Sequence, residues 1–321
     1  MVIKLLFAAA LIAHCAASSA ASGNLMDFNF DTGNPNPTGP KGQTTGPLNG
    51  LGCNGNCPEI TTEQVRAGDR AMKVYLNRLT SEVSYRTEAT LNSGLTFDTG
   101  GENPQDYWIG FSVYFKGPWT VETAPNPTTS FFNFHGSPPP ELGWGSGWCN
   151  NSNPLVVAVK PTTNTTGGIK VSIGGGGETG FCVGVPYNLK FAYVGTPVTY
   201  TVDEWIDVVI HVKWSPIAPN GFYRMWVNGT LVVDVTGALY HTGDPEPGPV
   251  YPKMGYYTGW KDRAMDEPVF ERTLYFDEYK IDWGAEAGYD TVAPGGGTSP
   301  PDPETPTKLP PMTNLRIVAP N

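Results

Sequence analysis

Basic residues, cysteine and long apolar runs are all scarce in this 321-residue chain. Its 20 Lys and Arg face 30 Asp and Glu, a formal net charge of −10. This argues against nucleic acid as a partner, because phosphate binding needs a basic surface. An anionic ligand is not excluded, since local cations act over about 10 Å before salt screens them. No stretch after the N-terminus reaches the roughly 18 unbroken apolar residues of a membrane span, so we expect no membrane partner.

The N-terminus has the pattern of an export signal. Lys4 precedes a short apolar run over residues 5–12, and small residues follow from 16 to 22. Such a segment is typical of a cleavable signal peptide, predicted here over residues 1–22. We therefore expect a secreted, extracellular protein that acts as a monomer.

Cysteine usage fits export. Of five cysteines, Cys15 lies in the signal, which leaves Cys53, Cys57, Cys149 and Cys182. An even number in an exported chain indicates two disulfides. We expect Cys53–Cys57 to close a tight loop and Cys149–Cys182 to tie two strands or loops together. Zinc is the competing interpretation, but the close Cys or His couples of a four-ligand site are missing.

Glycine (39), proline (31) and aromatic residues (12%) are abundant, which favours short strands joined by turns over long helices. We find no amphipathic helix longer than about three turns. Roughly a dozen strands, including an Asn228-Gly229 hairpin, predict an all-β, antiparallel β-sandwich or jelly roll. This domain is expected over residues 23–290, and a Pro/Gly-rich tail over 291–321. The expected strands are 24–30, 71–76, 84–91, 107–115, 130–135, 155–159, 169–173, 204–214, 223–234, 253–257 and 273–281.

Five segments in order resemble polysaccharide lyases of the heparin lyase I and glucuronan lyase type, which share a β-jelly roll. They are Tyr85-Arg-Thr-Glu88, Phe132-Asn-Phe-His-Gly136, the 205–214 strand with its hairpin, Lys253-Met-Gly-Tyr-Tyr257, and the closing strand 275–281. The likeness covers about residues 24–283. It implies a secreted lyase that cleaves a uronic-acid polymer, glucuronan-like or heparin-like, by β-elimination.

The chemistry of β-elimination explains the residue types. The C5 proton of a uronic acid becomes acidic only when cations or hydrogen-bond donors neutralise the adjacent carboxylate. A base then removes this proton, and an acid protonates the departing O4 oxygen. The reaction requires no metal or organic cofactor in principle, and its partner is an anionic polysaccharide.

The resemblance implies a role for each matching residue. His135 is a candidate base, and Tyr257 matches the catalytic tyrosine that protonates the leaving oxygen, or acts as base on some stereochemistries. Lys253 shares strand parity with Tyr257, and Asn133 shares it with His135, so each pair is expected on one face. Arg86 is a candidate for binding the substrate carboxylate. The glutamine that neutralises the carboxylate in glucuronan-acting members has no clear counterpart here.

Each of these residues also has a structural interpretation. His135 could cap a strand end, and Tyr257 could be an ordinary half-buried aromatic residue. Arg86 and Glu88 share parity and could form a surface ion pair. His211, in a strand expected to be buried on both sides, is more typical of a structural histidine.

Further candidates lie outside these segments. Trp144 and Trp148 could stack on sugar rings, or pack structurally in a loop held by Cys149. Asp27 and Asp277 could hold a structural calcium ion, or be ordinary acids at strand edges.

Two other functions compete with the lyase. A glycoside hydrolase on a similar sandwich needs two carboxylates about 5–10 Å apart. The adjacent acids 266–267 and 277–278 face opposite sides of a strand, which weakens that interpretation. A non-catalytic carbohydrate-binding module would lack the chemistry that His135 and Tyr257 supply.

Overall fold

The computed structural model describes residues 25–28, 30–32, 48–51, 57–77, 84–91, 106–119, 121, 129–136, 155–173, 192–215, 220–236, 250–260 and 271–297. The expected signal peptide, Trp144, Trp148, Cys53, Cys149 and Cys182 lie outside these residues, as does the chain after Gly297. Cys57 is described and exposed. The two disulfides and export therefore stay predictions. No helix in the described part is long and apolar enough to cross a membrane.

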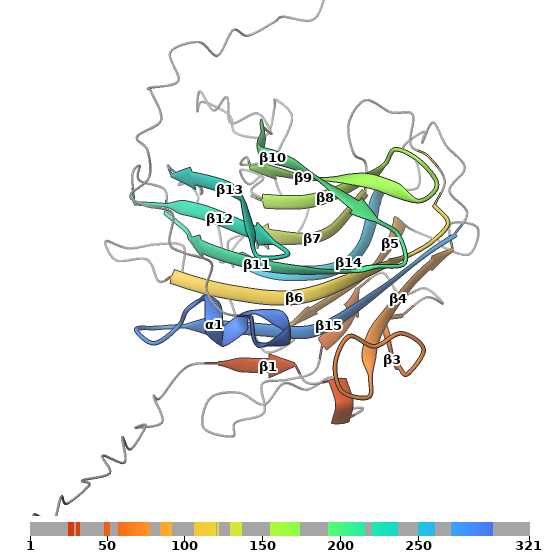
Figure 1. Cartoon of the computed structure of the whole chain (residues 1–321), viewed down its shortest axis with the longest axis horizontal. Coiled ribbons are helices and arrows are strands. Elements are labelled where there is room, and N and C mark those ends of the chain that lie inside the picture. Colours follow the sequence, from red (N-terminus) through yellow and green to blue (C-terminus); the bar gives the residue numbers. More distant parts are fainter. Residues whose placement is uncertain are drawn as a thin grey trace, which may run out of the picture.

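The strands form two antiparallel sheets, which lie against each other as layers (Figure 1). Sheet A has the order β13-β12-β11-β6-β15-β4-β3, with β1 also paired to β15, and sheet B has the order β10-β9-β8-β7-β14-β5-β2. The strands of sheet A are β1 (Met26–Phe28), β3 (Glu59–Thr61), β4 (Ala71–Asn77), β6 (Asp106–Lys116), β11 (Trp205–Lys213), β12 (Phe222–Val227), β13 (Thr230–Thr236) and β15 (Glu271–Trp283). Those of sheet B are β2 (Leu48–Leu51), β5 (Ser84–Leu91), β7 (Thr129–Gly136), β8 (Leu155–Pro161), β9 (Thr166–Ile173), β10 (Ala192–Thr201) and β14 (Val250–Trp260).

The main core fills the space between the two sheets. Alternate residues of each strand point inward, as the period of two in a strand requires. Phe111 of β6 stacks on Phe132 of β7 with ring centroids 4.9 Å apart, and both side chains are fully buried. This packing of two antiparallel sheets confirms the predicted β-sandwich.

The hairpin at Asn228-Gly229 is confirmed. It joins β12 to β13, and both turn residues have positive φ angles, +46° and +76°. An Asn-Gly pair adopts this left-handed conformation readily, because Asn tolerates it and Gly has no Cβ.

A second, smaller apolar cluster lies on the outer face of sheet A. There α1 (Tyr289–Val292) packs against β6, β11 and β15, and η3 (Pro294–Gly296) follows it (Figure 1). Val292 and Ala293 are buried against Val209 and Trp226. The packed fold thus continues through residues that the composition had placed at the start of the tail.

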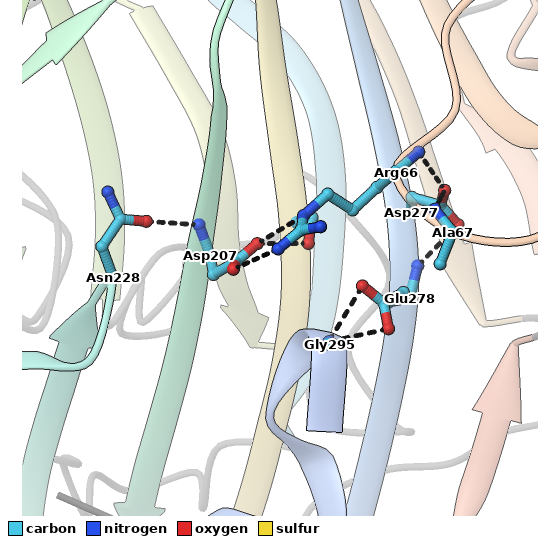
Figure 2. Close-up of polar contacts among 8 residues, drawn as sticks. Arg66, Ala67, Asp207, Asn228, Asp277, Glu278 and Gly295 are labelled. Atoms are coloured by element: carbon cyan, nitrogen blue, oxygen red, sulfur yellow. Dashed lines mark hydrogen bonds and ion pairs between the residues drawn. The ribbon is translucent and has the colours of Figure 1, made fainter. Parts of the chain in front are cut away.

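Carboxylates hold the peripheral segments to sheet A (Figure 2). The Arg66 guanidinium forms an ion pair with Asp207 at 3.0 Å, and the amides of Arg66 and Ala67 donate to Asp277 at 2.8 and 3.1 Å. The Gly295 amide donates to the Glu278 carboxylate at 2.9 Å. These contacts fasten both the 57–70 segment and the turn after α1 to the sheet.

The two acids considered for calcium have other neighbours. Asp277 accepts backbone amides, while burial raises its pKa above the ordinary value. Asp27 pairs in register with Lys280, and burial raises its pKa also. Within the described ranges, no three His, Cys, Asp or Glu side chains gather into a metal-binding group. The calcium ion stays a prediction.

Candidate active site

The predicted catalytic residues and Asn133 lie on three neighbouring strands of sheet B. The order β7-β14-β5 places β14 in the middle. Along these strands Phe132, Phe134, Ala89, Met254 and Tyr256 belong to the core. Residues of the other parity point away from the core, onto a surface that we call the site face. An irregular register between Ser130 and Phe132 reverses the parity at the start of β7, so that Phe131 belongs to the core and Ser130 to the site face.

Strand register brings four of the five predicted catalytic and binding residues that the structure describes into two cross-strand pairs. Lys253 of β14 lies opposite Asn133 of β7. Tyr257 of β14 lies opposite Arg86 of β5. The backbone of Arg86 thus occupies the position expected for a carboxylate-binding residue, and its side chain lies outside the described part of the structure.

The two adjacent tyrosines of β14 face opposite sides. Tyr256 is 1% exposed, lies in the core, and has its hydroxyl 3.3 Å from the Thr129 hydroxyl. Tyr257 is half-buried and follows Lys253 in parity along an uninterrupted register with β5. Tyr257 is therefore the tyrosine of the pair that a substrate on the site face could reach.

His135 lies at one end of the site face, opposite Tyr251. The Tyr251 hydroxyl lies 3.4 Å from His135 Nδ1, and the Lys253 ammonium lies 5.6 Å from the centre of the Tyr251 ring. Tyr251 thus contacts both candidates. Sequence reasoning missed it, although it shares parity with Lys253 and precedes it by two residues.

His135 and Tyr257 are not neighbours on the site face. Tyr257 lies opposite Ser130, which is five residues from His135 along β7. At about 3.3 Å per residue, this separates the two backbone positions by roughly 16 Å. The Lys253–Asn133 pair lies between them.

Glu88 is a second residue that sequence reasoning missed. Its side chain is 3% exposed, and its carboxylate accepts a 2.9 Å hydrogen bond from Asn133 Nδ2. Glu88 shares parity with Arg86, which pointed to a surface ion pair. Because it is buried, Glu88 is part of the site rather than of a solvated surface.

The site face continues onto β8 and β9. Tyr257, Ser130, Ala158 and Lys170 form successive cross-strand pairs on β14, β7, β8 and β9. Lys160 has the same parity as Ala158 on β8, and both lysines are half-buried. Small side chains at 130 and 158 thus lie between Tyr257 and a local group of cations, although the whole chain is acidic.

His211 belongs to the opposite side of the molecule. It is 8% exposed on the outer face of sheet A, and its ring stacks on Trp108 with centroids 3.8 Å apart. Burial lowers its pKa, although Asp106 lies 3.4 Å away. This burial and ring stacking are typical of a structural histidine.

Fold and site face together define a class of protein: a β-jelly roll that carries candidate acid–base residues and cations on the outer face of one sheet. The chain belongs to the polysaccharide lyase family, whose profile matches residues 36–280. The protein is therefore a polysaccharide lyase.

Comparison with solved structures supports the fold through one structure with a TM-score above 0.5. The chain is similar to the endo-β-1,4-glucuronan lyase of the fungus Trichoderma reesei, with a TM-score of 0.54 and 14% identity over 84% of this chain and 98% of that one. It is also similar to an alginate lyase from Klebsiella pneumoniae, with a TM-score of 0.47 and 13% identity over 83% and 97% of the two chains. No curated protein matches the sequence.

Proposed function

We propose that this lyase is secreted and cleaves a uronic-acid-containing polysaccharide by β-elimination. The first candidate substrate is a glucuronan-like polymer. The observation that carries the proposal is a pair of cross-strand register positions on neighbouring strands, Lys253 with Asn133 and Tyr257 with Arg86. This register brings the backbone positions of two basic residues, an asparagine and a tyrosine within a patch of a few residues.

In this proposal, Asn133, Lys253 and Arg86 neutralise the substrate carboxylate. A uronate must share its negative charge with donors before its C5 proton can leave. Lys253 is 5% exposed and Asn133 is 4% exposed. Their donors act in a poorly solvated place, where charge–charge and hydrogen-bond interactions are stronger than in water.

Tyr257 is proposed as the residue that protonates the leaving O4 oxygen. The C5 proton and O4 are attached to neighbouring ring carbons, so one phenol can reach both when they lie on the same side of the ring. Tyr257, starting as the phenolate, then takes the C5 proton and, as the phenol, donates it to O4 as the C4–O4 bond breaks and the C4–C5 double bond forms. When the two groups lie on opposite sides, a separate base is needed, and His135 is the candidate.

The basic residues near Tyr257 favour a polymer with regularly spaced negative charges. Lys160 and Lys170 extend the cationic surface along β8 and β9, which suits a chain with one carboxylate per sugar. The structural neighbour with the higher TM-score of the two is a glucuronan lyase. A heparin-like chain, with sulfate groups in addition, is the second candidate.

The test measures ultraviolet absorbance from unsaturated uronate ends on glucuronan, heparin, heparan sulfate and alginate. We expect absorbance to rise when the wild type acts on glucuronan. The rate of this rise should be at least about 10²-fold lower in Tyr257→Phe, since positioned acid–base groups contribute 10²–10⁴-fold to a rate. Tyr256→Phe is the matched control. It removes a hydroxyl from the adjacent, core-facing tyrosine and should keep kcat.

Three outcomes would change the proposal. Equal loss in Tyr256→Phe and Tyr257→Phe would withdraw the assignment of Tyr257. Activity only on heparin would replace the polymer, and elimination abolished by His135→Ala would make His135 the base. No absorbance on any uronate would overturn the substrate class.

A further inference from the structure

The hydrogen bond between Glu88 and Asn133 joins two strands that are not neighbours. Glu88 is on β5 and Asn133 is on β7, and β14 runs between them. The bond therefore crosses over the backbone of β14. Glu88 lies opposite Gly255 in the register, and a glycine puts no side chain in its path.

This crossing point lies among the proposed catalytic groups. Gly255 is two residues from Lys253 and two residues from Tyr257 on the same strand, so all three share one parity. The nitrogen of the Asn133 amide is directed toward them, because it donates to a carboxylate on the far side of β14. A substrate carboxylate bound between Lys253 and Tyr257 would meet the nitrogen side of that amide.

The amide of an asparagine has two orientations of nearly equal shape, related by a half-turn that exchanges oxygen and nitrogen. An ionised carboxylate only accepts hydrogen bonds, so it stabilises the orientation with nitrogen toward it and repels the other. Asn133 Oδ1 is buried and accepts no hydrogen bond within the described part of the chain, so nothing there holds the amide from its oxygen side.

We propose that Glu88 is a positioning residue for the elimination: it selects the Asn133 orientation that presents N–H groups, rather than the carbonyl oxygen, to the substrate carboxylate. This rests on the proposed function, in which Asn133 helps to neutralise that carboxylate. In the reversed orientation the oxygen would oppose the carboxylate, and the enolate-like intermediate would lose a donor.

The discriminating variant is Glu88→Gln. It keeps the size of the side chain and its ability to hydrogen-bond, but its amide can donate as well as accept. A glutamine amide accepts from one orientation of Asn133 and donates to the other, so it no longer selects between them. We expect kcat to fall about tenfold, less than the 10²–10³-fold loss for removal of a whole donor, because half of the amide orientations still present N–H groups. KM should stay within about twofold and the unfolding temperature near that of the wild type. A purely structural role of Glu88 would leave kcat unchanged in this variant.

Two further comparisons sharpen the test. In an Asn133→Ala background, Glu88→Gln should cause no additional loss, because coupled residues are not additive. Thr87→Val is the matched control: Thr87 is a buried, core-facing polar residue of the same strand, whose hydroxyl donates to the Tyr75 carbonyl at 3.0 Å. It should lower stability and keep kcat. Independent losses from Glu88→Gln and Asn133→Ala would overturn the proposal.

A readout without substrate separates this proposal from the proposed function. In the wild type, the Asn133 side-chain amide should give one set of NMR signals, with one Nδ2 proton protected from exchange. Glu88→Gln should give two sets or lose the protection. Identical signals in both proteins would overturn the role of Glu88 whether or not a uronate polymer is cleaved. Failure of the wild type to cleave any uronate, with the signals as expected, would overturn the function and its catalytic use of Asn133 while the selection by Glu88 stands.

Discussion

Gly255 has a backbone conformation that other residues rarely adopt. Its φ angle is +142°, and a Cβ at this position would lie 2.3 Å from the Thr87 carbonyl oxygen and 2.6 Å from the Glu88 Cα. Both contacts are with the backbone of β5, which cannot move aside as a side chain can. The glycine thus lets β5 and β14 pair closely at the centre of the site face.

The substitution Gly255→Ala should therefore cost both stability and activity. We expect a loss of at least about 1–3 kcal/mol in the free energy of unfolding, the range for one strained backbone position, with a lower kcat because β5 carries Arg86 and Glu88. Urea unfolding and initial rates measure the two effects. Gly288→Ala, at a position with open space and no positive φ, is the control. Unchanged stability in Gly255→Ala would contradict the steric argument.

At the residue scale, parity along a strand predicted which candidates share a face. Lys253 with Tyr257 and Asn133 with His135 are placed as expected. Parity gives no information on a contact across an intervening strand, so it left a surface ion pair as the only suggestion for Glu88 and did not predict its bond to Asn133. The distance between two candidates on different strands depends on the strand register, which cannot be read from the sequence. The separation of His135 from Tyr257 was therefore not predicted.

At the level of elements, alternation and turn residues predicted the long strands and the hairpin at 228–229. The structure adds β2, β3 and β10. Two of these have only three or four residues, too few to show a period. β10 contains Gly195 and Pro197 and has an irregular register between Val194 and Val198, so its composition was typical of a loop. Similarly, α1 has four residues in a Gly/Pro-rich stretch, and only its packing on sheet A reveals it.

His211, which stacks on Trp108 on the outer face of sheet A, should make the free energy of unfolding depend on pH. Burial holds its folded-state pKa below the value of about 6.5 expected in the unfolded chain. The unfolded state therefore binds the proton more tightly, so this contribution to stability is complete above about pH 6.5 and is lost as the pH falls toward the folded-state pKa. The charged neighbours Asp106, Lys213 and Arg224 enter the same balance.

The measurement is urea unfolding of the wild type and His211→Phe between pH 5 and pH 7.5. We expect the variant to lose less stability over this interval, because phenylalanine keeps the stacking on Trp108 and does not titrate. Parallel curves for the two proteins would show that His211 is not the group responsible. Lys213→Met, which removes a neighbouring charge and keeps the histidine, should retain the dependence.

On the scale of the whole molecule, the outer faces of the two sheets differ in what lies on them. Sheet B carries the candidate catalytic residues on its outer face, whereas the outer face of sheet A is covered in part by α1, η3 and the 57–70 segment (Figures 1 and 2). Changes on sheet A should therefore act on stability, and changes on the site face on chemistry and substrate binding.

Two lysines extend the site face of this acidic chain. The net charge of −10 should repel a polyanion at long range, while Lys160 and Lys170 attract it locally. We expect Lys170→Ala to raise KM for a long polyuronate several-fold at low salt with kcat preserved. The effect should shrink toward 1 M salt, where the screening length is about 3 Å.

Lys73→Ala is the matched control for this experiment. Lys73 lies on sheet A and forms ion pairs with Glu59 and Glu63 at 3.3 and 2.7 Å. It removes the same charge from the opposite sheet, so KM should not change. Equal increases in KM for Lys73→Ala and Lys170→Ala would show that only the total charge matters and that no polymer runs along β8 and β9.

The position of α1 also determines how this enzyme can be used as an immobilised catalyst. The turn at residues 284–286 is exposed at the end of β15, next to the segment that covers sheet A. Coupling to a resin through the exposed Glu286 would anchor the molecule by its sheet A side. The site face on sheet B would then point into solution, where a long, slowly diffusing polymer can reach it.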